Sequence, residues 1–295
     1  MNKGSEFKTR SRLPAMAAAI FTILHSSCTE PISDEDGSRS DRLILAVEVP
    51  QMTKSPVYSQ YLSPASKIGV TLVEEGKDTY AGATYHNIMF TAYGREEDQF
   101  WVTSSEIDLS DTKGKLYVYY PYTSSYDTHR ISASDGDTDF LWYSVSDVSR
   151  RNNIVRVQLD HKKAVFRIKL VRGDYDGLGN ISSVSIVGRN GYRYADLDIL
   201  SGEYINGVAS CMETHLPNRT LDDVPSIDFL VMPNGKKDYV IITSYIDEVL
   251  YQINTEPFTA LPGMVYEFTV TLNKLTGSDE YRARQTSLNI YDYEE

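Results

Sequence analysis

A chain of 295 residues is long enough for one large domain or two ordinary ones, and a hydrophobic content of 41% is sufficient for a packed core. The net charge of −12 argues against a general nucleic-acid binder, which needs a basic face for phosphates, and against docking on an anionic membrane through basic residues. Tyrosine is frequent, at 22 residues against 9 phenylalanines, and suits half-buried strand surfaces because its ring packs inward while its hydroxyl reaches water.

Residues 1–27 have the pattern of a lipoprotein-type signal peptide. A short basic leader precedes the apolar run Leu13–Leu24, which would span about 18 Å as a helix, too short to cross about 30 Å of hydrocarbon. The run ends in Leu24-His25-Ser26-Ser27-Cys28, which is similar to a bacterial lipobox except that His25 stands where an aliphatic residue is usual. We therefore expect acylation of Cys28, and the alternative is an ordinary secretory signal with an incidental cysteine.

The chain has two cysteines, Cys28 and Cys211, so it is not a disulfide scaffold. If Cys28 carries lipid, we expect Cys211 to be a buried small hydrophobic residue. If Cys28 is not acylated, a disulfide between the two is conceivable.

An acidic tether or propeptide, residues 28–42, precedes a region of short apolar runs with period-2 alternation. Turn residues separate these runs, and no stretch of 12 residues has a helical stripe, so the sequence predicts an all-β fold of sandwich type. The expected strands are Leu43–Val49, Lys67–Val73, Asn87–Ala92, Gln99–Thr103, Lys115–Tyr119, Ile154–Leu159, Ala164–Val171, Val184–Val187, Ile227–Met232, Tyr239–Tyr245, Val249–Ile253 and Val265–Leu272.

We expect two β-sandwich domains, residues 43–160 and residues 161–295, because each part holds enough strands for a sandwich. The boundary is placed at His161-Lys162-Lys163, between two strand patterns. The last stretch contains a short alternating segment, Thr286–Tyr293, which is a candidate for a detachable final strand.

The histidines do not have the spacing of a metal or catalytic site. No two of them lie at i, i+4 or in an HxH or HExxH arrangement, and no phosphate-binding loop or nucleophile elbow occurs. His86, His129, His161 and His215 are interpreted as structural. We therefore expect no enzyme activity, no metal and no cofactor.

The segment Ser134-Asp135-Gly136-Asp137-Thr138-Asp139 alternates carboxylates. This spacing is compatible with Ca²⁺, but the downstream bidentate Glu and the flanking helices of an EF-hand are absent. A pair of carboxylates also suits acid–base work if a cleft holds them at a fixed distance. We interpret the segment as a solvated acidic loop.

Four segments together resemble the fimbrillin family, the lipoprotein-derived subunits of type V pili of Bacteroidales. The segments are Gly114–Tyr122 (GKLYVYYPY), Asp139–Tyr143 (DFLWY), Leu159–Ile168 (LDHKKAVFRI) and Leu261–Leu272 (LPGMVYEFTVTL). Their order and spacing fit the family over about residues 43–293. Each also has a structural reading: Tyr117 and Tyr119, for example, share one strand face, with Leu116 and Val118 on the other.

The resemblance implies two tandem transthyretin-like β-sandwiches on a lipoprotein of the bacterial outer membrane and cell surface. It implies that an Arg-specific protease cuts the N-terminal segment, removes a first strand, and opens a groove that a strand from another subunit fills. The expected partners are other pilus subunits, that protease and a host surface receptor, with no nucleic acid and with membrane contact through the lipid anchor only.

Under this resemblance, Arg42–Leu43 is the preferred cleavage site and Arg39–Ser40 the second, and the alternative is that both arginines are plain tether charges. The donor strand is Thr286–Tyr293, carried by Thr286, Leu288 and Ile290, with Leu288 and Ile290 on one face. The alternative is that this segment completes the chain's own C-terminal sandwich.

Two other functions remain open. One is a pilus anchor or tip adhesin of the same fold. The other is a surface glycan-binding lipoprotein or glycosidase, which usually exposes tryptophan platforms; here Trp101 and Trp142 both lie in strand patterns that favour burial.

Overall fold

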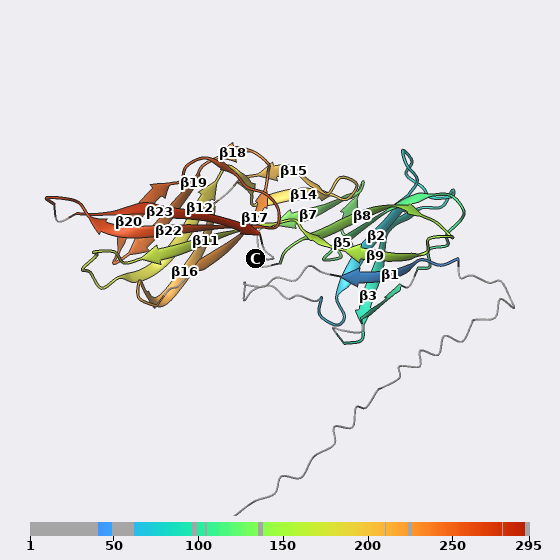
Figure 1. Cartoon of the computed structure of the whole chain (residues 1–295), viewed down its shortest axis with the longest axis horizontal. Helices are drawn as coiled ribbons and strands as arrows, with labels where there is room; N and C mark the ends of the chain where they lie inside the picture. The colour runs from blue at the N-terminus through green and yellow to red at the C-terminus, as the bar shows by residue number, and fades with distance from the viewer. Residues whose placement is uncertain are drawn as a thin grey trace, which may run out of the picture. The chain divides into compact units, whose positions relative to one another are not determined.

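The structure is a computed structural model that describes residues 41–48, 62–95, 99–103, 105–134, 138–209, 211–223, 226–278 and 280–292. Every regular element among these residues is a β-strand, so the predicted all-β class is confirmed (Figure 1). The described residues belong to one compact unit, Ser40–Glu295. The division into two sandwich domains at residue 160 stays a prediction.

The first half of the chain forms a six-stranded antiparallel sheet and a separate parallel pair. The sheet has the order β10 (Asp160–His161), β8 (Leu141–Val148), β5 (Gly114–Tyr120), β2 (Lys67–Val73), β3 (Tyr85–Tyr93) and β4 (Phe100–Thr103). The pair joins β1 (Ile44–Glu48) to β9 (Ile154–Gln158). Leu45 and Val157 from the pair belong to the same core cluster as Ile68, Val70 and Leu116 from the sheet. The pair is therefore fixed to the sheet by apolar packing.

The second half forms a sandwich of two larger sheets and a two-stranded piece. The five-stranded sheet runs β13 (Gly191–Tyr192), β17 (Ile227–Pro233), β11 (Ala164–Val171), β22 (Met264–Lys274) and β23 (Tyr281–Asp292). The four-stranded sheet runs β16 (Cys211–Thr220), β12 (Asn180–Gly188), β19 (Val240–Ile246) and β20 (Val249–Asn254). The small piece pairs β18 (Lys237–Asp238) with β21 (Phe258–Thr259).

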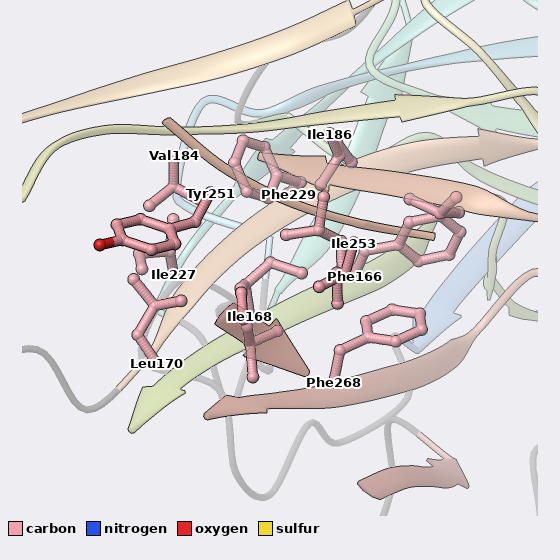
Figure 2. Packing of buried hydrophobic residues seen from close by; sticks show 14 of the residues in the cluster. Phe166, Ile168, Leu170, Val184, Ile186, Ile227, Phe229, Tyr251, Ile253 and Phe268 are labelled. Atoms are coloured by element: carbon pink, nitrogen blue, oxygen red, sulfur yellow. The ribbon is translucent and has the colours of Figure 1, made fainter. Parts of the chain in front are cut away.

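Alternation along the strands places the sandwich core. In β11, Phe166 and Ile168 face the core, and the parallel neighbour β22 contributes Tyr266, Phe268, Val270 and Leu272. Figure 2 shows the labelled side chains of these two strands meeting Ile186 and Ile253 of the opposite sheet. The Phe166 ring contacts the Phe268 ring edge-on, with centroids 5.8 Å apart. The aromatic residues of these two strands thus fill the space between the sheets.

A further four-stranded sheet takes strands from both halves of the chain. Its order is β15 (Glu203–Val208), β14 (Tyr194–Asp198), β7 (Arg130–Ser134) and β6 (Tyr126–Asp127). At its centre Leu197 pairs with Ile131, and both belong to a core that also contains Tyr117 and Tyr119. Leu116 and Val118 enter the other core, so the predicted division of β5 into two faces is confirmed.

All twelve strands expected between Leu43 and Leu272 occur within four residues of their predicted bounds. The sequence analysis missed the longer strands β7, β8, β14, β15 and β16 and the two-residue strands β6, β10, β13, β18 and β21. In β8 the polar residues Ser144 and Ser146 interrupt the apolar pattern, and β16 combines polar residues with Pro217. Pro217 is tolerated because β16 is an edge strand and the proline lies where its register with β12 shifts.

The prediction that Cys211 is buried is wrong, since the side chain is exposed. Cys211 begins the edge strand β16, where Met212 and Leu216 pack against the core. Alternation then turns Cys211 to the outer face. Cys28 lies outside the described residues.

Candidate strand-exchange site

The segment Arg42–Glu48 is attached to the body through both backbone and side chains. Among the described residues, β9 is the only strand that pairs with β1. Leu43 and Leu45 are 8% and 5% exposed and enter the core, whereas Ile44 is 46% exposed. A five-residue strand with one partner and few buried anchors is a weakly held element.

The Arg42–Leu43 peptide group is itself hydrogen-bonded. Leu43 N donates to Ile107 O at 3.2 Å, and Arg42 O accepts from Asn153 Nδ2 at 3.2 Å. The Arg42 side chain is mostly exposed, and its Nη1 lies 2.9 Å from Glu106 Oε1. The predicted cleavage residue therefore presents its side chain to solvent while its backbone is engaged. Arg39, the second choice, lies outside the described residues.

The predicted donor segment forms the greater part of β23, described up to Asp292. This strand pairs antiparallel with β22 along its length, with Phe268 opposite Leu288 and Tyr266 opposite Ile290, and it forms an edge of the five-stranded sheet. Leu288 packs against the sandwich core, while Ile290 is 51% exposed. The chain's own sheet thus carries this segment, and its outer edge has no partner strand among the described residues.

On the other face of β23, Tyr291 near the end of the strand makes a polar contact with Arg167 of β11. Arg167 Nη1 donates to the Tyr291 hydroxyl at 3.1 Å, and Arg167 also makes a two-pronged pair with Asp228 at 2.8 and 2.7 Å. The hydrogen bonds that Arg167 donates to the Asp228 carboxylate hold the pKa of Arg167 above its usual range, and burial raises the pKa of Tyr291. Thr286 Oγ1 lies 3.1 Å from Thr271 Oγ1 on β22.

The acidic segment behaves differently from the expectation of a solvated loop. Asp139 is buried: its Oδ2 lies 2.6 Å from His161 Nδ1, and its Oδ1 accepts from Lys163 N at 3.0 Å. Asp139 is thus a structural acceptor for the segment between β10 and β11. Asp135 and Asp137 lie outside the described residues.

Neither tryptophan forms an exposed platform. Trp101 and Trp142 are both partly buried and pack against core clusters. Trp142 Nε1 also donates to Ile199 O at 2.8 Å.

The structure brings together one group that the sequence reading did not connect. Asp78, His86 and His129 offer ligand-type atoms that all lie within 4.8 Å of one another. No local spacing links them, because they come from three separate turns and strands.

Within the described part of the chain, no helix is long and apolar enough to cross a membrane.

Comparison with known proteins finds a matching family model and solved structures of similar fold. The family model described as "Fimbrillin-like" matches residues 60–289. A crystal structure of a candidate cell adhesion protein from Bacteroides uniformis is 16% identical, with a TM-score of 0.61 over 86% of this chain and 99% of that one. One from Bacteroides ovatus is 14% identical, with a TM-score of 0.59 over 84% and 96%. At this identity the two structures support the fold alone. A search of the sequence against curated proteins found no match.

Proposed function

The chain belongs to the fimbrillin-like family, and from that premise we propose that it is a structural subunit of a cell-surface fimbria and not an enzyme. Subunits assemble by exchange of β-strands with sister subunits. The chain reaches the outer membrane as a lipoprotein acylated at Cys28, and processing by an Arg-specific protease starts assembly. A host surface receptor is a further partner of the finished fimbria.

The observation that carries this proposal is that both terminal strands are edge elements with a single partner strand. β1 pairs only with β9 and β23 only with β22, among the described residues. Each still sends side chains into a core, Leu45 from β1 and Leu288 from β23. If such a strand leaves, it exposes a row of backbone donors and acceptors beside an apolar slot, which a strand from another chain can fill.

In this scheme β23 is the donor and the position of β1 beside β9 is the acceptor. Leu288 and Ile290 lie on one face, opposite Phe268 and Tyr266 in the chain's own sheet. Two fully buried aliphatic side chains contribute about 1.5–3 kcal/mol each, so they alone do not hold a fimbria together. Backbone pairing with β9 must add to them.

Cleavage at Arg39 or Arg42 removes the residues before β1 and leaves β1 joined to the body. The cut therefore acts by releasing the tether, after which β1 leaves by dissociation. Detaching β1 covalently needs a cut after Glu48, and Lys54 is the only basic residue between Glu48 and Lys67. The sequence of the mature N-terminus distinguishes these routes.

A pilus anchor or tip adhesin of the same fold is the second candidate. The hydrogen bonds of the Arg42–Leu43 peptide group favour it, since a protease must draw an extended backbone into its active site. Mass spectrometry of the surface protein separates the two roles. A mature chain that begins at acylated Cys28 indicates an anchor, and one that begins at Ser40 or Leu43 indicates a processed stalk subunit.

Assembly is tested on cells that express the chain with Leu288→Asp. A charge at this position opposes burial in an acceptor slot, so filaments seen by electron microscopy should be lost. Asn289→Asp is the matched control, because the neighbouring residue is exposed and faces the other way. Filament numbers that are normal for Leu288→Asp, with the folded protein on the surface, would reject β23 as the donor.

A further inference from the structure

Two histidine rings converge on one carboxylate at the surface of the six-stranded sheet. Asp78 lies in the connection between β2 and β3, His86 near the start of β3, and His129 in the turn between β6 and β7. His86 Nε2 lies 3.2 Å from Asp78 Oδ1, and His129 Nε2 makes a hydrogen bond to the same oxygen. The two rings meet edge to face with centroids 4.5 Å apart. Both Nε2 atoms are thus aimed at one point.

The backbone holds His129 in this position at a conformational cost. Its φ of +62° lies in the left-handed region that residues with a Cβ rarely adopt, and the preceding Thr128 has a φ of +48°. Ile199 N donates to the His129 carbonyl at 2.8 Å, which ties the turn to the strand pair β7–β14. Positive φ at both residues is the geometry that a two-residue type I′ hairpin turn uses, so the turn between β6 and β7 fixes the place of His129.

A hydrogen-bond chain fixes the orientation of the His129 ring from behind. The Tyr126 hydroxyl lies 2.6 Å from His129 Nδ1 and 3.3 Å from Thr71 Oγ1, and Thr71 is fully buried. When the tyrosine hydroxyl donates to Thr71, its oxygen accepts a hydrogen bond from Nδ1–H. In this tautomer His129 Nε2 presents a lone pair, and a metal ion bound there replaces the hydrogen bond between Nε2 and Asp78. This is the arrangement by which proteins orient an imidazole that binds a metal.

The side chains of Asp78, His86 and His129 differ in solvent exposure, as a metal site that is open to water on one side requires. The His86 and His129 side chains are 19% and 12% exposed, whereas Asp78 is 71% exposed. The histidines form a sheltered base, and the carboxylate forms the side that faces water. His86 Nε2 donates to the Asp78 carbonyl oxygen at 2.7 Å, so a metal ion bound at this nitrogen replaces that hydrogen bond.

We propose that Asp78, His86 and His129 form a binding site for a divalent transition-metal ion of the Zn²⁺ type. Two imidazole nitrogens and one carboxylate oxygen are ligands that suit zinc, and less so the oxygen-seeking ions Ca²⁺ and Mg²⁺. Three protein ligands leave a coordination position for water or for a group on another molecule. Bound metal joins the β2–β3 connection to the β6–β7 turn, and so joins the six-stranded sheet to the sheet that combines both halves of the chain.

Calorimetric titration with ZnCl₂ tests the site, with both cysteines replaced by serine so that no thiolate competes. The full chain should bind one zinc ion per molecule, and its melting temperature should rise as zinc is added. Binding should be lost in His129→Gln and in Asp78→Asn, and the exposed side chain of Asp78 allows Asn without loss of the fold. His215→Gln, on the exposed face of β16, should bind normally.

Tyr126→Phe adds a test of the orienting chain. It leaves all three ligands in place and should weaken zinc binding by about 10- to 100-fold. Co²⁺ should give the visible absorption of a low-coordinate site in the parent chain and in His215→Gln, and not in Asp78→Asn or His129→Gln. The proposal is overturned if the parent chain does not bind zinc, or if Asp78→Asn and His129→Gln bind it as well as the parent does.

Discussion

Leu45→Ala gives the sharpest prediction about how β1 is held. Leu45 is 5% exposed in the core beside Val157, so truncation removes buried methyl groups and leaves a cavity. Such changes cost about 2–5 kcal/mol. Because β1 pairs with β9 alone among the described strands, we expect this cost to appear as local detachment of β1 before the rest of the chain unfolds.

Native-state hydrogen exchange measures that detachment. At about 1.4 kcal/mol per factor of ten, the amides of β1 and of its partner β9 should exchange roughly 30- to 4,000-fold faster. Amides of β11 and β22, in the other core, should change little. The control is Ile44→Ala, because Ile44 is the exposed neighbour on the same strand.

Two results would refute the reasoning. One is equal acceleration in Leu45→Ala and Ile44→Ala, which would mean that the buried side chain does not anchor the strand. The other is uniform acceleration across all sheets, which would mean that β1 opens only when the whole chain unfolds.

Three further predictions concern the body of the fold. Burial opposes ionisation of Asp247, but hydrogen bonds from Tyr175 Oη, Gly179 N and Asn180 N at 2.7, 2.7 and 2.8 Å outweigh it and lower its pKa below the ordinary 3.8. The contribution of ionised Asp247 to the free energy of unfolding is therefore present above pH 3.8 and is lost as pH falls through the folded-state pKa. In urea unfolding, Asp247→Asn should be less stable than the parent at pH 7, and this difference should vanish in acid. A difference that does not depend on pH would contradict this. Asp139→Ala should lower the free energy of unfolding by about 1–3 kcal/mol, because Lys163 N and His161 lose a buried acceptor; no loss in urea titration would contradict a structural role. Gly69→Ala should cost about 1–3 kcal/mol, because an added Cβ would lie 2.1 Å from the Tyr119 ring; the double variant with Tyr119→Leu should recover part of that loss.

The strands with unbroken apolar alternation could be predicted from the sequence. Ala164–Val171 forms β11 with the predicted bounds, because its alternate apolar residues pack into two different clusters. β8 and β16 could not be predicted in this way. Their polar residues are accommodated by neighbouring strands, and local alternation does not report those neighbours.

Pairings between distant segments account for most of what the sequence reading missed. The parallel pairing of β1 with β9 and the union of β7 with β14 depend on the tertiary fold. For the same reason Asp139 appeared to belong to an acidic loop, although its burial comes from its contact with His161. His86 and His129 could be recognised as neighbours only after the β6–β7 turn was placed.

The edge position of β23 was within reach of the sequence, since the alternating segment Thr286–Tyr293 was expected as a final strand. The observed strand begins earlier, at Tyr281, because Ala283 and Tyr281 also pack against the sandwich core. Whether this strand acts within its own chain or between chains depends on an exchange reaction, which sequence patterns do not encode.

A reversible lock on β23 tests the central claim of strand exchange most directly. The Oγ1 atoms of Thr271 and Thr286 lie 3.1 Å apart, so Thr271→Cys with Thr286→Cys in a Cys211→Ser background should form a disulfide between β22 and β23. The matched control is Ser185→Cys with Thr243→Cys, which joins the interior strands β12 and β19 through another pair of contacting hydroxyls.

Electron microscopy of cells before and after a mild reductant gives the answer. We predict that the oxidised Thr271–Thr286 lock abolishes filaments, that reduction restores them, and that the interior lock supports filaments in both states. Normal filaments from subunits whose Thr271–Thr286 lock is shown by mass spectrometry to be closed would contradict donation of β23 between subunits.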